Sequence, residues 1–140
     1  MVTAADADAQ ALENAELLER LRQATAGLLF LSETDAPFTP FLWTMQKIGA
    51  EVLTAETLRA YQGLSANAPV ESVEFKAFFA RLTHEGNTDA QRYRDLERLL
   101  SQHLSDLVVW RAGEIQVDIF IIGKTPSGDF AGVATQAVET

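Results

Sequence analysis

The residues of this sequence with the clearest chemical potential do not form a common catalytic motif. The segment Gly123-Lys124-Thr125 resembles the end of a phosphate-binding loop, which also needs a glycine five positions earlier and a helix afterwards. The sequence has Asp118 at the earlier position and Pro126 directly after the segment, so we reject a phosphate-binding loop. The absence of Cys also excludes thiolate zinc sites, disulfides and cysteine nucleophiles.

The two histidines, His84 and His103, do not have the spacing of metal ligands on one helix. Ser101 lies close to His103 in the sequence, but a catalytic triad is a spatial arrangement that needs a third, orienting group. No G-x-S-x-G elbow is present either. We therefore expect no catalytic residue, no metal site and no cofactor in this chain.

Glu114 and Asp118 are a pair of carboxyl groups that could share a proton. They lie four residues apart in a region of strand pattern, and this spacing puts both side chains on one side of a strand. An enzyme that uses this pair in a cleft is therefore one alternative. The simpler interpretation is that one carboxylate caps a turn and the other is hydrogen-bonded or solvated, so we predict that the chain is not an enzyme.

Helices are predicted in the first two thirds of the chain. Residues 11–26 repeat leucines at helical spacing and end before Gly27, and residues 54–63 have Thr54 as an N-cap and Gly63 as a stop. Two further helix faces are marked by Phe75, Phe78, Phe79 and Leu82, and by Tyr93, Leu96, Leu100, His103 and Leu107, the second with Asn87 or Thr88 as its cap.

Strands are predicted in the last third. The β-rich run 107–111, the alternating run 115–122 and the run 130–138 are separated by turn residues. Residues 37–43 alternate apolar with small or polar residues but contain two prolines, which indicates a further edge strand or an extended segment. The middle strand is apolar on both faces in its second half, which indicates a sheet covered on both sides. We predict an α+β fold with helices on both faces of a mixed sheet that ends in an antiparallel meander.

The composition predicts a globular protein of one domain. The chain has 140 residues, of which 47% are hydrophobic and 22% charged. We expect a flexible N-terminal segment at residues 1–10 and a single domain at residues 11–140. Because the start lacks the pattern of a signal peptide and no apolar run could span a membrane, we expect a cytoplasmic protein with no membrane contact.

The net charge of -9 argues against nucleic acid as a direct partner, because binding to phosphates depends on clustered Lys and Arg. The acidic excess is largest in the first 40 residues, which contain only two basic residues, Arg20 and Arg22. The acidic residues of the same stretch are Asp6, Asp8, Glu13, Glu16, Glu19, Glu33 and Asp35. Such a field favours a cationic partner, including a protein whose own ligand is an anion. A surface tuned only for solubility is the simpler explanation of the same charge.

Two blocks of the sequence carry a more specific signal. Residues 27–43 read GLLFLSETDAPFTPFLW, and residues 110–140 read WRAGEIQVDIFIIGKTPSGDFAGVATQAVET. Their succession of GLL, SE, PF, FLW, GE, IG-x-TP, AG and a terminal VET resembles the nuclease A inhibitor family. With the leading helix, the resemblance extends over nearly the whole chain.

The resemblance implies an inhibitor of a sugar-nonspecific, Mg²⁺-dependent nuclease on a three-layer α/β/α sandwich similar to that of PR-1 proteins. It also implies that the C-terminal Thr140 enters the nuclease active site, where it could contact the bound Mg²⁺, and that Glu33 meets nuclease arginines. Glu139 in the same terminal motif is the third expected contact with the partner. We expect a monomer when the protein is free.

Two parts of the chain depart from the family pattern. Residues 48–75 match it poorly, and the loop from Thr83 to Asp89, around His84, is shorter and lacks an acidic–aromatic pair that belongs to the family's interface. An interaction or regulatory module on the same fold, without nuclease inhibition, is therefore the alternative function.

Overall fold

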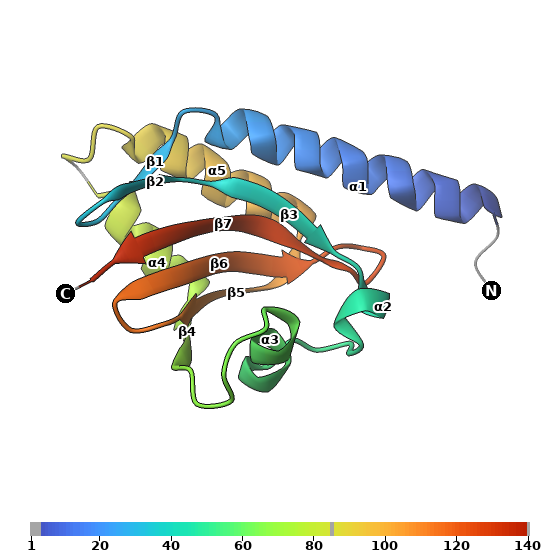
Figure 1. Cartoon of the computed structure of the whole chain (residues 1–140). Helices are drawn as coiled ribbons and strands as arrows, with labels where there is room; N and C mark the ends of the chain where they lie inside the picture. The colour runs from blue at the N-terminus through green and yellow to red at the C-terminus, as the bar shows by residue number, and fades with distance from the viewer. Residues whose placement is uncertain (1–3, 85, 140) are drawn as a thin grey trace.

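The computed structural model of the chain describes residues 4–84 and 86–139, with side chains from residue 13 onward. Its centre is a five-stranded sheet of order β3-β7-β6-β5-β4 (Figure 1). The strands are β3 (Thr39–Trp43), β4 (Val70–Glu74), β5 (Ser105–Ala112), β6 (Gln116–Lys124) and β7 (Phe130–Val138). A separate two-stranded hairpin is formed by β1 (Leu29–Leu31) and β2 (Asp35–Pro37).

Every strand pair of the five-stranded sheet is antiparallel, so the predicted mixed sheet is wrong. The reason lies in the connections. The last three strands follow one another through short turns, and the helices after β4 return the chain to the antiparallel neighbour of that strand. A sheet with helices packed on both faces is typical of parallel strands. Antiparallel strands can also be packed between two layers of helices when apolar residues line both faces of the sheet.

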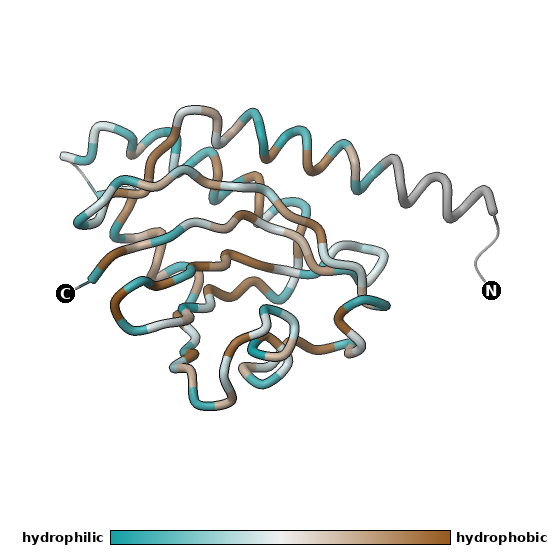
Figure 2. Tube along the Cα trace, in the orientation of Figure 1, coloured by the Kyte–Doolittle hydropathy of each residue, from teal (hydrophilic) through white to brown (hydrophobic). Residues whose placement is uncertain are grey.

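Helices pack on both faces of the sheet. On one face lie α1 (Ala4–Thr25), α4 (Phe75–Leu82) and α5 (Ala90–His103); on the other lie α2 (Met45–Ile48) and α3 (Ala55–Tyr61) (Figure 1). The first face buries Leu21, Phe79 and Leu96 against the sheet, and the second buries Leu58. Figure 2 shows the apolar residues concentrated on the central strands between these two layers. The α+β class is confirmed, and the similarity to PR-1 proteins stays a prediction.

The strong sequence patterns agree with the structure. The stripe of three phenylalanines is buried on α4, Thr54 caps α3 by accepting a hydrogen bond from the N–H of Thr57 at 3.2 Å, and the run 130–138 is β7. The edge strand predicted in residues 37–43 is β3, which carries Pro40 and pairs only with β7. The first helix begins at Ala4, earlier than predicted. Whether residues 1–10 are flexible stays a prediction.

Other boundaries were wrong. The N-cap of α5 is Asp89, so neither Asn87 nor Thr88 is the cap. The N–H of Asp89 donates to the side chain of Asn87 at 2.9 Å, and Asn87 belongs to the preceding turn. The helix ends at His103, and Leu107 belongs to β5. No helix in the described part of the chain combines the length and apolar character that crossing a bilayer requires.

Two glycines of the resemblance have a structural reason. A Cβ at Gly132 of β7 would lie 1.7 Å from the carbonyl oxygen of Ile121, so a side chain would force β6 and β7 apart. Gly113 begins the β5–β6 turn with a φ of 117°, and a Cβ there would meet the carbonyl oxygen of Gln116 at 2.2 Å. The sheet and its turn therefore both depend on glycine at these positions.

Candidate functional site

An open hollow of about 830 Å³ lies at the end of the sheet where β7 finishes. We call it the terminal hollow. It is bordered by the β1–β2 hairpin, by α4 and by residues of β4, β5 and β7. Its apolar lining includes Phe30, Val73, Phe78 and Leu82, and its charged lining is Glu33, Glu71, Arg81, Arg111 and Glu139. The stacked rings of Phe30 and Phe78, with centroids 5.9 Å apart, join the hairpin to α4 beneath this site.

The turn of the hairpin is tied to the C-terminal strand. The Oγ of Ser32 accepts a hydrogen bond from the N–H of Val138 at 3.1 Å and donates one to the carbonyl oxygen of Thr34 at 2.7 Å. On the other side of the strand, the N–H of Glu139 donates to the carbonyl oxygen of Ile115 at 2.8 Å. The last described residues of the chain are therefore held between the β1–β2 turn and the β5–β6 turn (Figure 1).

This arrangement brings two of the three predicted contact residues together. Pairing of Leu31 with Asp35 leaves Glu33 at the tip of the hairpin, where it is exposed, and Glu139 follows the end of β7. Both side chains line the terminal hollow, although they lie at opposite ends of the sequence. The third predicted residue, Thr140, lies outside the described residues.

Arg111 is a charged residue of this site that sequence reasoning missed. Its guanidinium forms an ion pair with Glu139 and a second one with Glu71, with 3.6 Å between Nε and Oε1. The Arg111 side chain is only 18% exposed, whereas its two partners are 50% and 74% exposed. A clue was available, because Arg111 lies in the WRAGE segment of the resemblance and alternates with apolar positions of the predicted strand.

The charges around the terminal hollow leave it slightly acidic. Its described lining carries three carboxylates against two guanidinium groups, and Arg111 is engaged by two of the carboxylates. Carboxylate oxygens are hard ligands that suit both guanidinium groups and Mg²⁺. In its described lining the hollow has no histidine and no cysteine, and its one hydroxyl, Ser32, is committed to Thr34 and Val138. The exposed carboxylates of this lining are groups that pair well with cations.

A buried tyrosine fixes the start of the hairpin. The Oη of Tyr93 donates to the carbonyl oxygen of Leu29 at 2.9 Å. Burial, with a smaller contribution from the charge of Asp89, raises the pKa of Tyr93 to about 12. The phenol therefore keeps its proton, and its hydrogen bond to the hairpin, across the physiological pH range.

The other candidate residues do not gather at one place. His103 lines a separate hollow beside α1, and His84 is exposed in the turn after α4. Asp118 accepts a hydrogen bond from Gln136 at 3.1 Å and lines a hollow that does not include Glu114, which is exposed in the β5–β6 turn. Among the described residues, no three His, Asp or Glu side chains are placed to hold a metal ion. The structure thus gives the enzyme alternative no common cleft.

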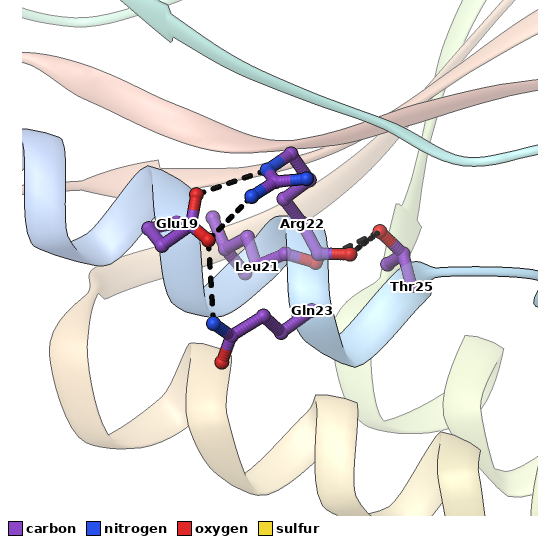
Figure 3. A network of polar contacts seen from close by, with 5 residues as sticks. All are labelled: Glu19, Leu21, Arg22, Gln23 and Thr25. Atoms are coloured by element: carbon purple, nitrogen blue, oxygen red, sulfur yellow. Dashed lines mark hydrogen bonds and ion pairs between the residues drawn. The ribbon is translucent and has the colours of Figure 1, made fainter.

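The acidic excess of the first helix is partly neutralised within the helix. Figure 3 shows Arg22 donating two hydrogen bonds to Glu19, at 2.9 and 2.5 Å, and Gln23 donating a third at 3.2 Å. These hydrogen bonds hold the pKa of Glu19 below its usual value. Arg20 pairs with Glu16 in the same way at 2.9 Å. Of the early acids whose side chains the structure describes, Glu33 is the one that lines the terminal hollow.

No curated protein matches the chain. One family model does, and its match over residues 15–140 includes the hairpin, the whole sheet and the C-terminal strand. By this match the chain belongs to the family of nuclease A inhibitor-like proteins.

Proposed function

We propose that the protein inhibits a sugar-nonspecific, Mg²⁺-dependent nuclease by placing its C-terminus and the acids of the terminal hollow in the nuclease active site. The observation that carries the proposal is the hydrogen bond between Ser32 and Val138, which puts the Ser-Glu turn beside Val138 and Glu139 near the end of the chain. These two motifs, far apart in the sequence, form one acidic surface. The family membership supports the same function.

The proposed mechanism is substrate mimicry. A nuclease active site is a cationic cleft shaped for phosphate, with a metal ion that prefers oxygen ligands. Glu33 and Glu139 supply carboxylates for arginines of that cleft, and Thr140 supplies a hydroxyl and the terminal carboxylate for the region of the metal. We propose that the protein blocks the cleft by binding alone, without chemistry of its own. We also propose that it acts as a cytoplasmic monomer.

Titration into a purified nuclease of this class tests the proposal. We expect cleavage of both DNA and RNA to fall as the protein is added, and to cease near a one-to-one ratio when the nuclease concentration exceeds the dissociation constant. A control variant, Glu56→Gln on the opposite face of the sheet, should inhibit as well as the unmodified protein. Unchanged cleavage at micromolar protein, with the nuclease of the same organism, would reject inhibition.

The loop from Thr83 to Asp89 favours a second candidate. This loop follows Arg81 and Leu82, which line the terminal hollow, so the shorter loop that the resemblance implies would alter the edge of the proposed interface. A module that uses the same surface for a protein other than a nuclease would fit this change. In a pull-down, that candidate predicts capture of a partner without nuclease activity, together with no inhibition in the titration.

A further inference from the structure

Two exposed aliphatic side chains lie beside the acidic C-terminal residues. Leu31 is 64% exposed and Ile115 is 61% exposed, values that among the large apolar residues of the described chain are matched only by Val52 at 65%. Single exposed apolar residues are ordinary on protein surfaces. The position of these two is informative, because each is joined to the end of β7.

The connections run through the backbone. Leu31 precedes Ser32, which accepts the hydrogen bond from Val138, and the carbonyl of Ile115 itself accepts the hydrogen bond from Glu139. Leu31 and Ile115 therefore flank two consecutive residues at the end of the chain. Leu31 also lines the terminal hollow, with its charged residues.

The exposure of Ile115 follows from the turn that carries it. Gly113 has a backbone conformation that residues with a side chain rarely adopt, and its N–H donates to the carbonyl oxygen of Pro69 at 2.9 Å. The turn thus holds Ile115 before β6 begins, whereas the following residues of β6 alternate into the two cores. Ile115 is therefore exposed to solvent, although the chain reaches its next buried position, Val117, only two residues later.

We infer that Leu31 and Ile115 are apolar anchors on the two sides of the acidic terminus, and that they dock on apolar side chains bordering the cationic cleft of the nuclease. This inference rests on the proposed function and specifies the chemistry of the partner surface. The charges select that partner, since three carboxylates line the hollow beside Leu31. Apolar contacts around the charged centre exclude water, which strengthens the charge pairs and slows dissociation.

The test compares Leu31→Ala, Ile115→Ala and the double variant with Val52→Ala, which removes a side chain of equal exposure in the segment between α2 and α3. Burial of an aliphatic side chain in an interface predicts that each single anchor variant raises the inhibition constant about 10- to 100-fold, mainly through faster dissociation. The dependence of the inhibition constant on salt should not change, because no charge is removed. Val52→Ala should stay within about twofold, and all four variants should keep the melting temperature because the side chains are exposed.

The outcomes separate the two proposals. If the unmodified protein inhibits and the anchor variants inhibit equally well, or no worse than Val52→Ala, the anchors are overturned and the proposed function stands. If the unmodified protein does not inhibit, the proposed function fails, and the anchors fall with it. An alanine variant that inhibits less but has also lost its melting transition is replaced in the test by Leu31→Met or Ile115→Val, which keep an apolar side chain and the fold. Normal inhibition by these variants supports the anchors. Weak inhibition by them, with the fold intact, overturns the anchors.

Discussion

The Oγ of Ser32 accepts a hydrogen bond from the N–H of Val138 at 3.1 Å, across a sequence separation of 106 residues. This contact joins the tip of an early hairpin to the final strand. Since Glu33 follows the first residue and Glu139 follows the second, this hydrogen bond helps to hold two acidic residues of distant segments close together.

Ser32→Ala should therefore reduce inhibition more than it reduces stability. Loss of one partly buried hydrogen bond costs about 1 kcal/mol of unfolding free energy, or roughly 3 °C in melting temperature. Inhibition should weaken about tenfold, because the tip of the hairpin would be held less firmly against the terminus, although Thr135 still donates a hydrogen bond to the carbonyl oxygen of Pro37 at the base of the hairpin. Ser65→Ala is the matched control, since its Oγ also accepts a backbone hydrogen bond, from Asn67 at 3.2 Å, in a distant loop. Equal inhibition by both variants would show that the contact does not organise the site.

Arg111 should hold Glu139 in position for the partner. Arg111→Met keeps the apolar stem and removes both ion pairs, so we expect the inhibition constant to rise roughly 5- to 30-fold. Association should become faster at low salt because the surface gains negative charge, while dissociation should accelerate more. Stopped-flow binding measures the two rates. Arg59→Met, which removes a guanidinium bonded to the carbonyl of Ala68 on the opposite face, should leave both rates unchanged; a matching change would contradict a specific role for Arg111.

The raised pKa of Tyr93 predicts that the free energy of unfolding falls at alkaline pH. Its pKa is raised to about 12 in the folded protein and is about 10 in the unfolded chain, so the folded state retains the proton longer. Below about pH 10 the phenol is neutral in both states, so stability does not depend on its titration. Between about pH 10 and pH 12 the unfolded chain ionises while the buried phenol does not, so the folded state loses about 2 kcal/mol of stability as the pH rises. Urea unfolding of the unmodified protein and of Tyr93→Phe across this range measures it. The phenylalanine variant should lose about 1 kcal/mol at pH 7 and decline less above pH 10; parallel curves would contradict the assignment.

The sequence predicts most elements because their patterns are local. Periodic apolar residues mark α4 and the strands β6 and β7 without reference to the rest of the chain. Strand β4 was missed because five residues with two glutamates show little periodicity, and it is a strand only because its residues pair with β5. The mixed sheet was wrong for the same reason, whereas the predicted C-terminal antiparallel meander is confirmed by β5, β6 and β7.

The site was predicted less completely than the fold. The resemblance supplied Glu33 and Glu139 as residues, but their proximity depends on the register of β7 against its neighbours and on the hydrogen bond from Val138 to Ser32. Arg111 was not found because its ion pairs reach Glu71 and Glu139, which lie on two other segments of the chain. A single sequence contains no direct signal of such tertiary contacts.

Deletion of Thr140 should separate binding from folding. The residue follows the last strand, and a terminal residue outside the ladder carries little stability, so the melting temperature should stay within about 1 °C. Loss of a charge-assisted contact in a desolvated cleft costs about 2–5 kcal/mol, which would weaken inhibition at least 30-fold. A C-terminal tag should have a comparable effect, whereas an N-terminal tag should have none. Full inhibition by the shortened chain would exclude entry of the terminus into the active site.

Glu33→Gln tests the charge of the hairpin tip while keeping its shape. If Glu33 meets arginines of the nuclease, the variant should inhibit less at low salt, and its inhibition constant should rise less steeply with added salt than that of the unmodified protein. Glu56→Gln controls for net charge, because it removes the same charge from α3 and should change the association rate only slightly. Equal salt dependence for the two variants would mean that the acidic surface steers the partner in general and that Glu33 makes no specific contact. Inhibition that survives both Glu33→Gln and the loss of Thr140 would reject substrate mimicry, although the protein could still inhibit by covering the cleft.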